Sequence, residues 1–179
     1  MTKKNSTFAN VLKERILVLD GAMGTMIQDY ELEESDFRGE LFSNHECDLK
    51  GNNDILCLTK NQLITEIHEK YLESGCDIIE TNTFNANKIS QADYNAEGYC
   101  FELNKMAAKL AKEACEKYST EDKPRFVAGA LGPTNKTLSI SPKVEDPGFR
   151  DISFDEMKKA YEEQTRGLVE GGSGLILIE

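Results

Sequence analysis

Acidic, hydroxyl and amide side chains follow directly after short apolar segments of this sequence. Asp20-Gly21-Ala22 ends one such segment, Thr81-Asn82 follows another, and Glu179 ends a third. Carboxylates such as Asp20 and Glu179 can bind an ammonium group, act as acid and base, or hold a metal ion. Glycine lets the backbone approach a ligand closely, and exposed N–H groups near a helix start can hold a carboxylate or phosphate.

These residues also have simpler explanations. Asp20-Gly21 is a common turn pair, which accounts for it as well as a functional role does. Thr81 and Asn82 could form a polar network that only stabilises the strand ends. Glu179 follows four apolar residues, and an acid at a buried strand's carboxyl end favours a functional role.

Four apolar segments are predicted to be the strands that position these residues. Each is short, aliphatic and not alternating, as in a parallel sheet covered on both faces. They span residues 16–20, 77–81, 126–130 and 175–179. The last of them needs protein layers on both sides, so we expect the chain to be part of a larger α/β enzyme.

Helices are predicted between the strands. Thr59 with Gln62, and Ser153 with Glu156, have the spacing of capping boxes that begin helices. Gly75 is a suitable stop for the first of these helices, and residues 171–172 for the second. Further helices are expected over residues 97–118 and 7–14, and the latter could close the bottom of a barrel.

The repeated strand–helix order predicts right-handed parallel βαβ units. A doubly wound sheet and a (β/α)₈ barrel both fit this order, although no GxGxxG motif supports dinucleotide binding after the first strand. A complete barrel needs about 250 residues and eight strands, so this chain would form half of one.

Composition excludes several classes of protein. The net charge of −11 argues against non-specific binding to nucleic acid or anionic membranes. The sequence has neither an apolar signal-peptide core nor a run of about 20 apolar residues, so we expect a cytoplasmic protein. Five cysteines without CxxC spacing predict no disulfide framework, and only His45 and His68 could join them as metal ligands.

Several consecutive motifs resemble the homocysteine-binding domain of cobalamin-dependent methionine synthases. The 50–54 segment is more similar to that family than to the betaine-dependent homocysteine methyltransferases. The motifs are LDGAMGTMIQ at 19–28, DFRGE at 36–40, CDLKGNND at 47–54, DIIETNTFN at 77–85, GALGPTN at 129–135 and LILIE at 175–179.

This resemblance implies a (β/α)₈ barrel in the TIM-barrel family, of which residues 1–179 would supply the first four βα units. It also implies methyl transfer to the sulfur of homocysteine, which zinc holds as the nucleophilic thiolate. In that family the methyl group comes from methylcobalamin, which methyltetrahydrofolate regenerates on other modules of the full-length chain.

The resemblance also assigns roles to individual residues. Asp20 and Glu179 would contact the substrate's amino group, the backbone at Gly21 and Ala22 would receive its carboxylate, and Thr81 and Asn82 would line the pocket. The family's zinc ligands, one single cysteine and an adjacent pair, are expected beyond Glu179. No catalytic residue and no metal ligand is therefore expected among these 179 residues, which should bind no cofactor and be inactive alone.

Three alternatives remain open at this point. The chain could be a non-catalytic module that self-associates through exposed sheet edges. It could belong to a homocysteine methyltransferase that uses betaine or S-methylmethionine. A phosphate-binding barrel is disfavoured, because no basic residue lies near the 21–24 turn.

Overall fold

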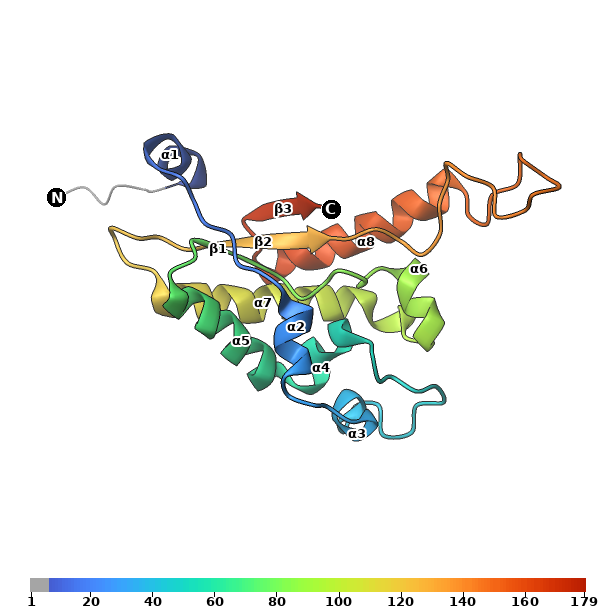
Figure 1. Ribbon diagram of the computed structural model, residues 1–179, viewed down its shortest axis with the longest axis horizontal. Coiled ribbons are helices and arrows are strands. Elements are labelled where there is room, and N and C mark those ends of the chain that lie inside the picture. Colours follow the sequence, from blue (N-terminus) through green and yellow to red (C-terminus); the bar gives the residue numbers. More distant parts are fainter. Residues whose placement is uncertain (1–6) are drawn as a thin grey trace.

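A small parallel sheet organises the computed structural model, which describes residues 7–179 (Figure 1). Its strands lie in the order β1 (Ile78–Glu80), β2 (Phe126–Leu131) and β3 (Leu175–Ile178). The parallel register pairs Ile78 with Phe126 and Ala128 with Leu175. The predicted parallel arrangement of these three segments is confirmed.

The predicted strand over residues 16–20 forms only in part. A single parallel bridge joins Leu19 to Ile78, supported by the Asp20 N–H, which donates to the Ile78 carbonyl at 2.9 Å. The next ladder position is altered because the Val18 N–H donates to the Asp77 carboxylate at 2.9 Å rather than to a backbone carbonyl. The segment therefore lies beside β1, but the prediction of a full strand is wrong.

Helices surround the sheet and connect its strands (Figure 1). The long helices α5, α7 and α8 pack against the strands and one another, and their buried apolar side chains, such as Ile67, Leu103 and Leu168, fill the core. The helices are α1 (Phe8–Glu14), α2 (Met23–Gln28), α3 (Glu34–Arg38), α4 (Leu56–Thr59), α5 (Asn61–Ser74), α6 (Lys88–Gln91), α7 (Cys100–Tyr118) and α8 (Phe154–Gly171), with 3₁₀ turns at Asn53–Ile55, Ala92–Tyr94 and Glu97–Tyr99.

One of the two predicted capping boxes is confirmed. Ser153 begins α8, and its N–H donates to the Glu156 carboxylate at 2.8 Å while its hydroxyl accepts from the Glu156 N–H at 3.3 Å. The prediction at Thr59 is wrong, because Thr59 is the last residue of α4 and its hydroxyl donates to the Ile55 carbonyl. Gly75 ends α5 in the left-handed conformation, as predicted.

The amino ends of the strands are closed by α1 and an ion pair. The Phe8 ring meets the Phe126 ring edge-on at 5.3 Å, and Arg15 makes a two-pronged contact with the buried Asp77 carboxylate at 2.7 and 2.8 Å. At the opposite ends, residues 132–152 leave β2 as an arm that projects from the body before α8 begins (Figure 1). Nowhere in residues 7–179 is a helix long and apolar enough to cross a membrane.

Candidate functional site

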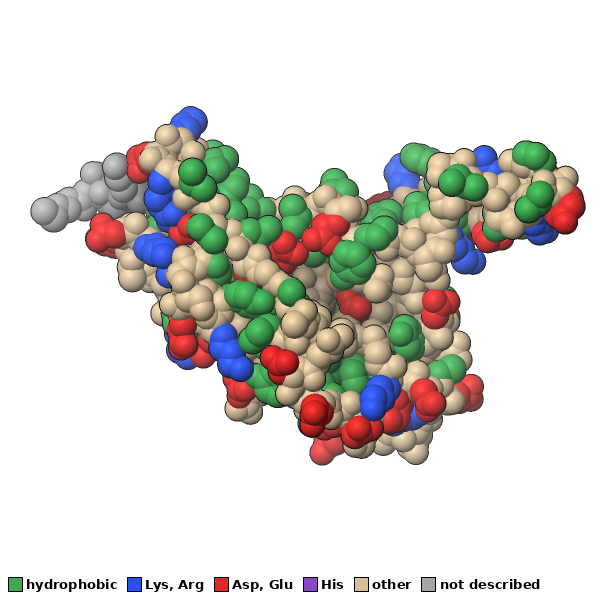
Figure 2. Space-filling view, in the orientation of Figure 1, with side chains coloured by type: hydrophobic (Ala, Val, Ile, Leu, Met, Phe, Trp, Pro, Cys, Tyr) green, Lys and Arg blue, Asp and Glu red, His purple; other side chains and the backbone are tan. Residues whose placement is uncertain are grey.

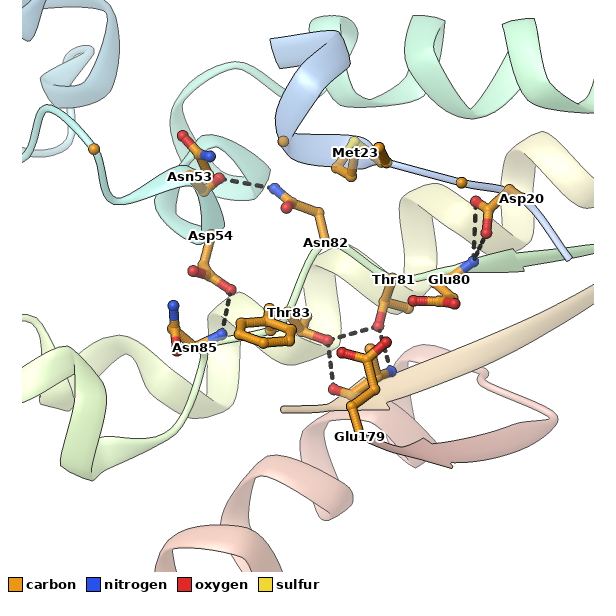
Figure 3. A pocket seen from close by; sticks show the side chains of 16 residues that line it. Asp20, Met23, Asn53, Asp54, Glu80, Thr81, Asn82, Thr83, Asn85 and Glu179 are labelled. Atoms are coloured by element: carbon orange, nitrogen blue, oxygen red, sulfur yellow. Dashed lines mark hydrogen bonds between the residues drawn. The ribbon is translucent and has the colours of Figure 1, made fainter. Parts of the chain in front are cut away.

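A cavity of about 490 Å³ lies at the carboxyl ends of the strands (Figure 3). The structure brings all the residues singled out in the sequence to this one cavity, although they come from three separate segments. The lining residues among them are Asp20, Gly21, Ala22, Thr81, Asn82 and Glu179.

Asp20 is anchored by the strand next to it. Both of its carboxylate oxygens accept the Glu80 N–H, at 3.1 and 3.2 Å (Figure 3). Burial raises the pKa of Asp20 to about 7, against the lowering effect of this hydrogen bond. Asp20 is thus held rigidly and takes up a proton near neutral pH.

Two further acids line the cavity that the sequence did not single out. Glu80 ends β1 and faces Glu179, and burial followed by that neighbouring carboxylate raises its pKa to about 6. Asp54 is buried and accepts the Asn85 N–H at 3.0 Å, and burial raises its pKa to about 6. With Asp20 and Glu179 they make four carboxyl groups, while none of the described lining residues is Lys, Arg or His. Such a cavity favours a positively charged group.

Thr81 belongs to a buried hydroxyl network that joins β1 to β2. Its oxygen accepts the Ala130 N–H at 3.0 Å and lies 2.6 Å from the Thr83 oxygen, while the Thr83 hydroxyl donates to the Ala130 carbonyl at 2.8 Å (Figure 3). The Thr81 hydroxyl must therefore donate to Thr83, because the Thr83 proton is already used. The Thr81 proton therefore stabilises the cavity wall and is not available to donate to a ligand.

Asn82 ties the cavity to the loop before α4. Its amide nitrogen donates to the Asn53 carbonyl at 2.8 Å, and the buried Cys57 thiol donates to the Asn82 carbonyl at 3.4 Å. The hydrogen bond between Asn82 and Asn53 holds Asn53 and Asp54 against the cavity, although these two residues are distant in sequence from the strand ends. No local sequence signal marks these two residues as cavity residues.

The start of α2 supplies N–H groups to the cavity. Residues Gly21 to Gly24 line it, Ala22 is the N-cap of α2, and no side chain caps this end. The first N–H groups of a helix have no partner within the helix, so they are available to an anion. A Cβ on Gly21 would lie 3.7 Å from the Tyr71 hydroxyl, an ordinary contact, so packing alone does not require glycine there.

The described part of the chain does not form a metal centre. Residues 7–179 bring no group of three or more His, Cys, Asp and Glu side chains into an arrangement that could hold a metal ion. Cys57, the cysteine beside Asn82, is fully buried, and burial raises the pKa of its thiol well above its usual range. The cavity is thus an acidic site at the carboxyl ends of the strands.

Comparison with known proteins identifies a family and several similar solved structures. The model of the family described as homocysteine S-methyltransferase matches residues 17–179. The fold is similar to the homocysteine methyltransferase MmuM from Escherichia coli. Its metallated form has a TM-score of 0.68 at 22% identity, covering 94% of this chain and 55% of MmuM.

The oxidised and apo forms of MmuM give TM-scores of 0.67 and 0.57, at 22% and 19% identity. The matches cover 93% of this chain in both cases, and 53% and 49% of MmuM. The chain therefore spans about half the length of the solved structures it matches.

Proposed function

The chain belongs to the homocysteine S-methyltransferase family, and from this premise we propose that it supplies the amino-acid-binding part of an enzyme that methylates the sulfur of homocysteine to form methionine. The observation that carries the proposal is the cavity with four carboxyl groups, no basic side chain among its described lining residues, and a helix start beside it. An amino acid zwitterion needs an acidic partner for its ammonium group and N–H donors for its carboxylate.

The roles of the cavity residues follow from this match of charges. Asp20 and Glu179 contact the ammonium group, and the backbone at Gly21 and Ala22 receives the carboxylate. Asn82 and Thr81 line the pocket, with Thr81 acting through the strand network described above rather than through its own proton.

We propose further that residues 1–179 are the N-terminal part of a (β/α)₈ homocysteine-binding barrel, contributing its first four βα units. The sequential parallel order of segment 16–20, β1, β2 and β3 supports this, as does the coverage of about half of MmuM. The described residues do not fit a zinc site. Ligands for a thiolate-binding zinc would come from the part of the fold that this chain does not span.

The methyl donor of the complete enzyme is proposed to be methylcobalamin, regenerated by methyltetrahydrofolate on other modules. Support comes from the 50–54 segment, which resembles the cobalamin-dependent enzymes. Betaine and S-methylmethionine are the alternative donors. Methyl transfer to homocysteine, assayed with zinc and each donor in turn, separates them for the complete enzyme. The 179 residues alone should not turn over, and robust zinc-dependent activity from them would contradict this.

Binding is the direct test of the proposed substrate. Isothermal titration calorimetry of this chain should compare L-homocysteine with 4-sulfanylbutanoate, which lacks the amino group, and with 3-aminopropane-1-thiol, which lacks the carboxylate. We expect the loss of the ammonium group to weaken binding about tenfold or more, since charged hydrogen bonds contribute about 1.5–3 kcal/mol. Equal affinity for all three compounds would refute recognition of an amino acid.

A second candidate is a non-catalytic module that self-associates. Apolar side chains are exposed beside the sheet, Ile16 at 89% and Ile178 at 79%, and Figure 2 shows hydrophobic side chains at the surface between α1 and the sheet. Open sheet edges of this kind invite pairing with another chain. Light scattering over a range of concentrations tests it: a monomer that persists at high concentration counts against this candidate.

A further inference from the structure

Glu80 connects the two carboxylates that are proposed to bind the ammonium group. Its backbone N–H donates to both oxygens of Asp20, while its half-buried side chain faces the Glu179 carboxyl group. Glu179 is in turn held in place because its own N–H donates to the Leu131 carbonyl at 3.1 Å. A single residue of β1 thus binds one acid through its backbone N–H and turns its side chain toward the other within the same cavity.

Without bound protons, the carboxyl groups around Glu80 would carry negative charges with no positive side chain among the described lining residues to offset them. Asp20, from the segment before α2, and Glu179, after β3, are the ionisable groups that face it, and Asp54 lines the same cavity. The neighbouring residues of β2 that face β1, Ala128 and Ala130, carry no charge. Four ionised carboxylates would repel one another and also the carboxylate of a zwitterionic ligand.

We propose that Glu80 is a positioning residue that couples ligand binding to proton release, the ligand's ammonium group replacing a proton held between Glu80 and Glu179. The released proton passes to the buffer, and the ammonium group takes over the charge compensation that the proton provided. The identity of the ligand rests on the proposed function, whereas the coupling rests on the placement of Glu80 between the two acids.

The direction of the pH dependence follows from the raised pKa values. The pKa of Glu80 is about 6 and that of Asp20 about 7, mainly because both are buried. Both groups therefore become protonated as the pH falls through this range, and each bound proton must leave before the ammonium group can bind. We expect affinity for an amino acid to fall by up to about tenfold per pH unit below the pKa of the coupled group.

Calorimetry can count the released protons directly. L-homocysteine is titrated into this chain near pH 6.5 with a chelator present, in phosphate and in imidazole buffer, whose ionisation enthalpies differ. Without metal the ligand thiol stays protonated at this pH, since ordinary thiols have a pKa of about 8.5. We expect between about 0.5 and 1 proton released for each ligand bound, because the pH lies near the pKa values of the coupled acids.

The Glu80→Gln variant keeps the size of the side chain and the backbone contact to Asp20. We expect it to release fewer protons than the wild type, because Asp20 alone then exchanges a proton in this range, and to reduce the fall in affinity between about pH 8 and pH 5. Glu121→Gln, which replaces an exposed acid outside the cavity, should leave both quantities unchanged. The wild-type proton count needs no variant and so does not depend on how well Glu80→Gln folds.

The outcomes separate the two proposals. Binding of L-homocysteine with no proton release overturns the coupling but leaves the proposed substrate in place. Proton release that persists unchanged in a folded Glu80→Gln variant overturns the assignment to Glu80. Absence of any L-homocysteine binding between about pH 5 and pH 8 overturns the proposed function and the coupling with it.

Discussion

Replacing His68 should make the stability of this protein less sensitive to acid. His68 lies on α5, is fully buried, and neither ring nitrogen has a hydrogen-bond partner. Burial lowers its pKa from 6.5 to about 4, so the folded protein keeps the ring neutral at a pH where the unfolded chain protonates it. His68 therefore destabilises the folded state as the pH falls from about 6.5 toward 4.

The magnitude follows from the two pKa values. Between about pH 7 and pH 4.5, proton uptake by His68 in the unfolded chain should cost the folded state about 2 kcal/mol. His68→Leu removes this cost together with two unpartnered polar atoms. We expect the variant to be more stable than the wild type by about 1–3 kcal/mol at pH 7, and the difference to widen by about 2 kcal/mol at pH 4.5.

Urea unfolding followed by far-UV circular dichroism measures this difference, since the chain contains no tryptophan for fluorescence. The comparison of variant with wild type removes the contributions of the acids, including Asp20, Asp54 and Glu80, whose raised pKa values make them respond to pH in the opposite direction. Ile67→Leu, a volume-conserving change at the neighbouring buried position, should show no pH-dependent difference. A stability difference for His68→Leu that is equal at both pH values would refute the reasoning.

Three further changes test the fold by the same unfolding measurement. Asp77→Ala should cost about 1–3 kcal/mol, because it removes the buried carboxylate that accepts the Val18 N–H and pairs with the partly exposed Arg15; a loss below about 0.5 kcal/mol would contradict this. Gly167→Ala should cost about 1–3 kcal/mol, since its Cβ would lie 2.7 Å from the Phe101 carbonyl oxygen. Gly98→Ala, with no atom within 4 Å of the new Cβ, is the matched control and should be neutral or slightly stabilising. Ser153→Ala should cost about 1 kcal/mol through loss of the helix cap, and an unchanged midpoint would argue that the cap contributes nothing.

Local signals predicted most of the fold, and long-range contacts explain the errors. The Ser153 box and the Gly75 stop depend on a few neighbouring residues, so the sequence suffices to find them. At Thr59 the same signal fails because Thr59 is itself the last of the four residues that form the helical turn α4. The 16–20 segment lacks a full ladder because Asp77, distant in sequence, binds the Val18 N–H.

The site residues that the sequence predicts are those that lie at the carboxyl ends of strands. Parallel strands deliver their carboxyl ends to one edge, which is why Asp20, Thr81 and Glu179 meet at one cavity. Glu80, like Glu179, is an acid at the end of an apolar run. The pattern that indicates Glu179 as a site residue therefore also indicates Glu80. Asp54 could not have been found, because its burial depends on the contact between Asn82 and the 53–54 turn.

The central claim is that Asp20 recognises the ammonium group of homocysteine. The most direct measurement is the effect of Asp20→Asn on affinity for two ligands, L-homocysteine and 4-sulfanylbutanoate, by calorimetry near pH 8. Asparagine keeps an oxygen that can accept the Glu80 N–H, so the change removes mainly the charge. We predict a loss of about tenfold or more for L-homocysteine and less than about threefold for the ligand without an amino group. An equal loss for both ligands, or no loss for L-homocysteine, would contradict the account.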